Sequence, residues 1–168
     1  RMIEKETNGY VPPRILIVDD SRMVRASIIK HLHGHFDIRE ESDGEAAWQT
    51  LVLDLSVVAV ISDIQMPKLD GFGLLTRVRS SRLKRLQEIP FILVSGAESE
   101  EERDRAKAMG VSDFITKGIG TAEILTRLNH LLELARTRHQ LEESRKQMVQ
   151  DMKSGVFTRK FIELQAAQ

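Results

Sequence analysis

Short apolar runs alternate with longer amphipathic stretches from residue 14 onward. Such alternation is typical of successive βαβ units around a parallel sheet, in which strands buried on both faces are almost wholly apolar. We predict five strands, at Arg14–Asp19, Phe36–Glu40, Val57–Ser62, Pro90–Val94 and Ser112–Ile115. The pattern therefore predicts an α/β fold with a doubly wound parallel sheet.

The stretches between these runs place apolar residues at helical spacing, with charges on the opposite face. We predict helices at Ser21–His33, Gly44–Leu53, Gly71–Arg82, Ser99–Met109 and from Thr121 onward. In doubly wound sheets, ligands bind beyond the carboxyl ends of the strands, near the point where strand order reverses. Functional side chains are therefore expected at that edge.

The last helix continues past the point where a compact domain would end. Leu134, Leu141 and Met148 repeat every seven residues within a segment otherwise dominated by charge and glutamine. This repeat favours a coiled-coil or helical-hairpin seam. The partner positions of the seam are polar, so a single solvated helix is the alternative.

Composition narrows the classes of function. The 168 residues suffice for one domain and a modest appendage. Lys plus Arg and Asp plus Glu both number 25, so the zero net charge offers no field that favours nucleic acid or an anionic membrane. The chain has no cysteine and no apolar run of membrane-spanning length. These features favour a cytoplasmic protein without direct nucleic-acid or membrane partners.

Acidic residues follow two of the predicted strands. Asp19 and Asp20 end the first strand and Asp63 follows the third, so their carboxylates should converge at one edge of the sheet. Converging carboxylates repel each other unless a cation lies between them. An all-oxygen ligand set suits Mg²⁺, which keeps several waters. The sequence therefore predicts a divalent-cation site.

A hydroxyl and an ammonium group are expected at the same edge, because Ser95 follows the fourth strand and Lys117 the fifth. Each can bind a phosphoryl oxygen, and a carboxylate can act as the nucleophile. Taken singly, an Asp pair is often a turn or helix cap, Ser95 a turn residue and Lys117 a surface lysine. Their combination at four strand ends favours phosphoryl transfer.

Three segments resemble the receiver domain of two-component response regulators: ILIVDDS, ISDIQMPKLDGFGLL and VSGAESEEERDRAKAMGVSDFITK. The resemblance covers about residues 14 to 132. It implies a flavodoxin-like sheet in the order 2-1-3-4-5, with an extended C-terminal helix. It also implies a signalling protein rather than an enzyme, whose only catalysis is its own phosphoryl transfer and dephosphorylation.

The resemblance assigns roles to the acidic residues. Asp63 would be the phosphoacceptor and would also bind the metal, Mg²⁺ or Mn²⁺. Asp20 would bind the metal directly, and Asp19 would do so directly or through water. The backbone carbonyl of Gln65 would be a further ligand.

The resemblance also implies a switch. Ser95 and Lys117 would contact the phosphoryl group, and Ser95 would swing toward it, which frees space for Phe114 to rotate inward. Phe114 has no hydroxyl that could hold either rotamer, and a fixed core position is the alternative. Gly118 stands where the family usually has a proline after a cis peptide. A non-proline cis bond costs about 2.5–4 kcal/mol, so this loop is expected to be trans, mobile or strained.

The family implies a sensor histidine kinase or phosphotransfer protein as partner, and a homodimer formed through the receiver face and the C-terminal helix. DMKSGVFTRKFIELQ resembles the opening of a diguanylate cyclase domain of the GGDEF type, although Lys153 and Thr158 depart from it. No GGDEF motif follows, so we expect a truncated output domain without cyclase activity. The expected organisation is an arm at 1–13, a receiver domain at 14–133, a linker helix at 134–150 and the GGDEF-like start at 151–168.

Other classes of function stay open. A phosphohydrolase of the haloacid dehalogenase kind expects two acids separated by one residue in the first strand, whereas Asp19 and Asp20 are adjacent. A receiver-like dimerisation or docking module without phosphorylation is kept open by Gly118. A flavin-binding protein would need a phosphate-binding loop after the first strand, which this sequence lacks.

Overall fold

The structure is a computed structural model that describes residues 12–118 and 122–155. Five strands form one sheet in the order β2-β1-β3-β4-β5. The strands are β1 (Arg14–Val18), β2 (Asp37–Glu41), β3 (Val57–Asp63), β4 (Phe91–Ser95) and β5 (Asp113–Thr116). All four pairings between neighbouring strands are parallel. The predicted doubly wound sheet and its strand order are thereby confirmed.

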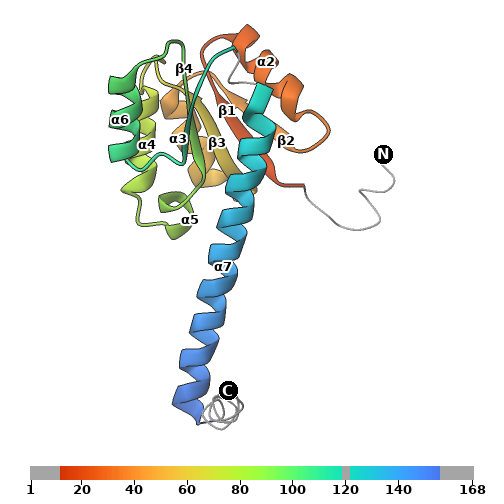
Figure 1. The fold of residues 1–168 in the computed structure, drawn as a ribbon, viewed down its shortest axis with the longest axis vertical. Coiled ribbons are helices and arrows are strands. Elements are labelled where there is room, and N and C mark those ends of the chain that lie inside the picture. Colours follow the sequence, from red (N-terminus) through yellow and green to blue (C-terminus); the bar gives the residue numbers. More distant parts are fainter. Residues whose placement is uncertain (1–11, 119–121, 156–168) are drawn as a thin grey trace. The chain divides into compact units, whose positions relative to one another are not determined.

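Helices cover both faces of the sheet (Figure 1). They are α2 (Arg22–Leu32), α3 (Gly44–Leu53), α4 (Gly71–Arg79), α5 (Lys84–Gln87), α6 (Glu100–Ala108) and α7 (Ile124–Ser154). The prediction of one helix over Gly71–Arg82 was wrong at its end, because α4 stops at Arg79 and the short α5 follows. At this point the Ser81 hydroxyl accepts the Leu83 N–H at 3.1 Å, a local bond that competes with helix continuation.

Two apolar clusters lie on opposite faces of the sheet, and alternate residues of β1, β3, β4 and β5 contribute to them. Leu16 and Leu93 pack with α3, α4, α5 and α6, whereas Ile17 and Ile92 pack with α2 and the start of α7. Burial of each such side chain stabilises the fold by about 1.5–3 kcal/mol. A slip of one residue would exchange the two faces, so this packing fixes the register and aligns the carboxyl ends of the strands.

Four helices begin at capped residues beside the carboxyl edge of the sheet. The side chains of Ser21, Asp43, Asp70 and Ser99 each accept a backbone N–H from the first turn of the following helix. Such a cap contributes about 1 kcal/mol and sets where the helix begins. The caps thus define where α2, α3, α4 and α6 begin at this edge of the sheet.

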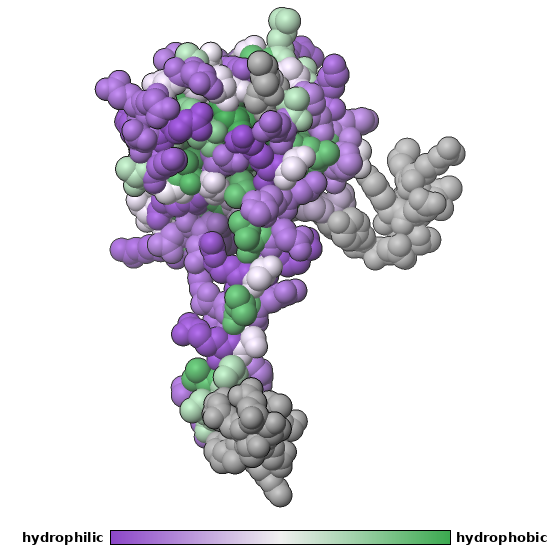
Figure 2. Space-filling model, viewed as in Figure 1, coloured by the Kyte–Doolittle hydropathy of each residue, from purple (hydrophilic) through white to green (hydrophobic). Residues whose placement is uncertain are grey.

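The chain divides into two compact units, residues 1–132 and 133–168. Helix α7 runs without a break from Ile124 to Ser154, and Ile124 and Leu128 are buried in the first unit. In the second unit, Leu134 and Leu141 are exposed, and Figure 2 shows apolar side chains spaced among hydrophilic ones along the helix. Within the described ranges, no helix is both long and apolar enough to cross a membrane.

Most of the two predicted end segments lies outside the described residues. Of the predicted arm at 1–13, only residues 12 and 13 are described, and the description of the GGDEF-like segment ends at Gly155. Its first residues, Asp151 to Ser154, form the last turn of α7. The resemblance to a cyclase opening therefore stays a prediction from sequence.

Candidate functional site

Three carboxylates converge at the carboxyl ends of β1 and β3. Each of Asp19, Asp20 and Asp63 offers an oxygen, and these oxygens all lie within 4.8 Å of one another. Asp19 and Asp63 are buried and Asp20 is exposed. The convergence follows from the pairing of β1 with β3, in which Val18 lies opposite Ser62. The predicted acidic cluster is therefore present, with one side open to solvent.

Asp19 is held in place by hydrogen bonds to one side-chain oxygen and to its main chain. Its Oδ1 accepts the Ser21 N–H at 2.8 Å, and its backbone carbonyl accepts from Arg25 Nη1 at 2.6 Å. Its buried Oδ2 has no hydrogen-bond partner among the described residues. Lys117 Nζ lies 3.5 Å from this oxygen and forms an ion pair with it. A buried oxygen in this state is costly unless a further positive group binds it.

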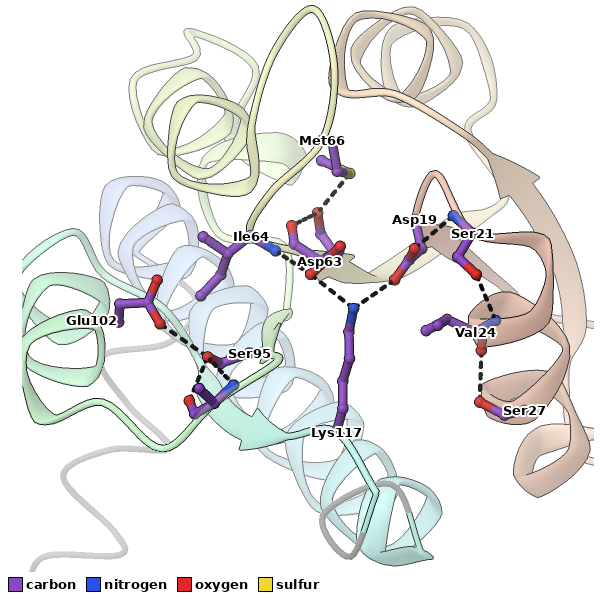
Figure 3. Close-up of polar contacts among 12 residues, drawn as sticks. Asp19, Ser21, Val24, Ser27, Asp63, Ile64, Met66, Ser95, Glu102 and Lys117 are labelled. Carbon is purple, nitrogen blue, oxygen red and sulfur yellow. Dashed lines mark hydrogen bonds and ion pairs between the residues drawn. The ribbon is translucent and has the colours of Figure 1, made fainter.

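Asp63 is a buried acid whose pKa is shifted by its surroundings. Its Oδ1 accepts the Ile64 N–H at 2.8 Å and lies 3.3 Å from Lys117 Nζ (Figure 3). Burial of the carboxyl, together with the charge of Asp19, raises the pKa of Asp63, and Lys117 opposes this only in part. The negative charge at Asp63 is thus incompletely balanced by the protein itself.

Lys117 supplies the positive charge that the protein places between Asp19 and Asp63. Burial alone would lower the pKa of Lys117, but the charges of Asp63 and Asp19 outweigh this effect and raise it above its usual range. The Lys117 N–H donates to the Ser95 carbonyl at 2.8 Å, which ties the lysine to the end of β4. The charged form of Lys117 is therefore favoured, and its main chain is fixed beside the end of β4.

The loop after Lys117 shows why glycine follows the lysine. Gly118 has φ = +87°, a conformation that costs little only for glycine, and the described residues contain no cis peptide bond. The trans alternative is therefore the one that the structure adopts. A proline could not take this backbone conformation, because its ring fixes φ near −65°.

The loop after β3 packs back against Asp63. The Gly71 N–H donates to the Ile64 carbonyl at 2.7 Å, and a Cβ at position 71 would lie 2.2 Å from the Asp63 carbonyl. Any larger residue would push the loop away from Asp63. Gln65, the residue that was expected to offer its carbonyl to a metal, lines the open pocket with Asp20 and Asp63.

Ser95 lies in the wall of the same pocket, which Lys117 and Glu102 also line. Its side chain is buried, and its hydroxyl lies within hydrogen-bond distance of Glu102 Oε1 at 2.9 Å and of the Ala97 carbonyl at 2.7 Å. Figure 3 shows these contacts on the α6 side of the pocket, whereas Asp63 lies beside Lys117. The structure thus brings Ser95 to the pocket with its hydroxyl bonded to the loop after β4 and to α6.

Phe114 faces the core, where its side chain is 3% exposed. The guanidinium of Arg103 lies 4.8 Å from the centre of its ring, and Arg103 Nη1 donates to the Phe114 carbonyl at 3.3 Å. The expectation that no hydrogen bond would hold the ring overlooked this cation–π contact.

Sequence reasoning missed three residues that contact the predicted site residues: Arg25, Glu102 and Arg103. For Glu102 a signal existed, since Ser99 and Glu102 have the spacing of a capping box. No signal in the sequence pointed to Arg25 or Arg103, because only the folded structure brings them into contact with Asp19 and Phe114.

The family model described as response regulator receiver domain matches residues 15–129. The gliding motility regulatory protein of Myxococcus xanthus is 37% identical over 118 residues, which are 67% of this chain and 14% of that protein. Response regulator MprA of Mycolicibacterium vanbaalenii is 31% identical over 123 residues, 73% of this chain and 51% of that protein. The chain thus spans about half the length of these relatives or less.

Solved structures show the same fold. The receiver domain of a Francisella response regulator aligns with a TM-score of 0.65 and 27% identity, over 73% of this chain and 98% of that one.

Proposed function

The chain belongs to the receiver domain family of two-component response regulators, and we propose that it accepts a phosphoryl group on Asp63. The observation that carries this proposal is the convergence of Asp19, Asp20 and Asp63 within 4.8 Å. Two of these acids, Asp20 and Asp63, line an open pocket together with Lys117 and Ser95. Of the acids in the cluster, Asp63 alone ends the central strand β3, where an incoming donor can reach it through the open pocket.

The transfer is a displacement at phosphorus. A carboxylate oxygen of Asp63 forms the new O–P bond while the bond from phosphorus to the donor nitrogen or oxygen breaks, and the leaving group takes up the proton that it needs. The phosphoryl oxygens carry negative charge throughout, and the Lys117 ammonium, 3.3 Å from Asp63, lies where it can bind one of them. Ser95 would donate to another after its hydroxyl turns from α6.

The residues present fit a divalent cation. The buried Asp19 Oδ2 lacks a donor within the described chain, and Asp20 is exposed toward the same pocket. We propose that Asp19, Asp20, Asp63 and the Gln65 carbonyl hold Mg²⁺, or Mn²⁺ in its place, because these hard oxygen ligands suit both ions. Bound there, the ion would neutralise charge on the phosphoryl oxygens.

The proposed partner is a sensor histidine kinase or phosphotransfer protein, which would present phosphohistidine at the open side of the pocket. The signal would leave through the face formed by α6, β5 and α7, because Arg103 of α6 already contacts Phe114 of β5. We further propose a homodimer through this face and the exposed Leu134, Leu141 and Met148 of α7. A GGDEF-type output domain after α7 rests on the sequence resemblance alone.

Intact-mass spectrometry after incubation with acetyl phosphate and Mg²⁺ tests the central claim. We expect one phosphoryl adduct on the parent protein, none on Asp63→Ala, and none when a chelator is present. Asp104→Ala is the matched control, since Asp104 is an exposed acid of α6 outside the pocket, and it should form the adduct normally. Absence of the adduct from a parent that binds metal would favour the dimerisation or docking module instead.

A further inference from the structure

Consecutive residues of α6 contact the two side chains that the proposed function expects to move. Glu102 Oε1 lies 2.9 Å from the Ser95 hydroxyl, and the Arg103 guanidinium lies 4.8 Å from the centre of the Phe114 ring. Neither α6 residue belongs to the acidic cluster or to the ion pairs that Lys117 forms with Asp19 and Asp63. Their contacts therefore call for a separate explanation.

The contact between Glu102 and Ser95 competes with phosphoryl binding. A serine hydroxyl has a single proton, so Ser95 can donate to Glu102, to the Ala97 carbonyl or to a phosphoryl oxygen, but to one acceptor at a time. Donation to a carboxylate is stronger than donation to a neutral carbonyl. Glu102 thus stabilises the arrangement in which the Ser95 hydroxyl is turned toward α6.

Glu102 also has an alternative partner close by. The Ser99 hydroxyl accepts the Glu102 N–H at 3.2 Å, which is one half of a capping box. In the other half of that motif, the glutamate side chain accepts the backbone N–H of the capping residue, which here is Ser99. In this structure Glu102 Oε1 accepts from the Ser95 hydroxyl instead. Release of Ser95 would therefore leave the Glu102 carboxylate with a second site at the positive end of α6. Both arrangements satisfy the carboxylate, as a two-state switch requires.

We propose that Glu102 is a positioning residue that holds the Ser95 hydroxyl away from Asp63 in the unmodified chain and thereby opposes phosphoryl binding. This inference rests on the proposed function of Asp63. Arg103 extends the arrangement, because it links the helix that carries Glu102 to Phe114 on β5. Since a ligand shifts an equilibrium by its differential affinity for two states, weakening the unmodified state must strengthen phosphoryl binding.

The first experiment measures binding of beryllofluoride, a phosphoryl mimic, in the presence of Mg²⁺ by titration calorimetry. Glu102→Ala should bind it about threefold to tenfold more tightly than the parent, the range expected for loss of one hydrogen bond that competes with binding. Glu102→Gln should restore most of the parental affinity, because its amide oxygen still accepts from Ser95. Glu101→Ala is the matched control, since it removes the same charge from an exposed position in the same turn, and it should change the affinity little.

The second experiment repeats Glu102→Ala in a Ser95→Ala background. If Glu102 acts through the hydroxyl of Ser95, its removal has no effect there. An equal gain in that background, or an equal gain for Glu101→Ala, would overturn the inference, since either result makes the effect one of general charge. Phosphorylation of Asp63 by acetyl phosphate in the parent separates the two failures. If it occurs while Glu102→Ala behaves like the parent, only the inference about Glu102 is lost, and if it does not occur, the proposed function is lost as well.

Discussion

Arg14 and Lys117 lie at opposite ends of the same sheet, and each is paired with two carboxylates. At the amino end, Arg14 Nη2 lies 2.8 Å from Asp37 and Arg14 Nη1 lies 2.8 Å from Asp54. The planar guanidinium has enough donors to hydrogen-bond both acids at once. Hydrogen bonds from Ser56, aided by Arg14, lower the pKa of Asp54. This triad is partly exposed and well satisfied.

At the carboxyl end of the sheet, one basic side chain is again paired with two carboxylates, but the pKa of a carboxylate shifts in the opposite direction. Lys117 Nζ lies 3.3 Å from Asp63 and 3.5 Å from Asp19, both of which are buried. The pKa of Asp63 is raised rather than lowered, and no group in residues 12–118 or 122–155 donates a hydrogen bond to Asp19 Oδ2. The contrast teaches that burial and donor geometry decide whether a charged triad stabilises a fold. The amino end of the sheet is thus balanced in charge, whereas the carboxyl end keeps an unbalanced negative charge, which the proposed function assigns to a divalent cation.

Lys117→Ala should show the largest difference in function between the two ends of the sheet. We expect the rate of phosphorylation by acetyl phosphate to fall by about 100-fold or more, because a positioned charge that binds the transferring group is lost. Arg14→Ala is the control and should keep nearly the parental rate, since Arg14 lies at the other end of the sheet. Quantitative intact-mass spectrometry over time measures both rates, and similar losses in the two variants would contradict the contrast.

Arg14→Ala should instead reduce stability. Its removal leaves Asp37 and Asp54 without their shared donor, and we expect the free energy of unfolding to fall by about 1–2 kcal/mol, a range kept small because the triad is partly exposed. Arg39→Ala offers the comparison, since Arg39 is more exposed than Arg14 and, within the described part of the chain, pairs with only one acid, Glu41, so that it should contribute less than about 0.5 kcal/mol. Urea unfolding measures both changes. Equal losses of unfolding free energy in the two variants would mean that Arg14 contributes no more to stability than an ordinary surface ion pair.

Asp63→Asn should stabilise the protein when a chelator is present. A carboxyl whose pKa is raised on folding favours the folded state below its unfolded pKa, near 3.9, and loses this contribution as pH rises through the folded value. At pH 7 we expect the variant to be more stable by about 1 kcal/mol, because it relieves repulsion with Asp19. Thermal unfolding between pH 4 and pH 7 checks the sign, and the difference between parent and variant should shrink as pH falls. A destabilised variant at pH 7 would show that Lys117 fully compensates Asp63.

Asp54→Asn should give the smallest effect, with the opposite dependence on pH. Because the pKa of Asp54 is lowered in the folded chain, its contribution is present above the unfolded value near 3.9 and is lost as pH falls through the folded one. The variant should therefore be less stable at pH 7, by about 0.5 kcal/mol, and approach the parent below pH 4. Urea unfolding at pH 7 and pH 3 distinguishes this outcome from a difference that does not change with pH.

The alternation of short strands with amphipathic helices was sufficient to predict a parallel sheet, because strands buried on both faces are almost wholly apolar, as at β1, β3 and β4. The strand order came from the family resemblance. The predicted strands also placed Asp19, Asp20 and Asp63 at one edge, since the carboxyl ends of neighbouring parallel strands meet there. Element ends were harder to predict. The end of α4 depends on the Ser81 hydroxyl, and α5 is too short for its one buried side chain, Leu86, to form a pattern.

The pairings at the site were not accessible from sequence for a different reason. The Ser95 hydroxyl was expected to contact the phosphoryl group. The sequence pattern gives no sign that this hydroxyl is hydrogen-bonded to Glu102 in the unmodified chain. Likewise the partners of Arg14 lie 23 and 40 residues away along the chain, and only tertiary folding brings them together. Residue type predicted what each group can do, whereas three-dimensional packing decides its present partner.

Helix α7 shows how a domain can support structure beyond its own core. Starting a helix is the costly step, because several residues must be fixed before the first hydrogen bond forms, whereas each later residue adds with little penalty. The buried Ile124 and Leu128 fix the first turns of α7 as part of the first unit, so the residues up to Ser154 lengthen a helix that already exists. A substitution that loosens Ile124 would therefore lower helix content well beyond Leu132, because it removes the nucleus from which the later turns propagate.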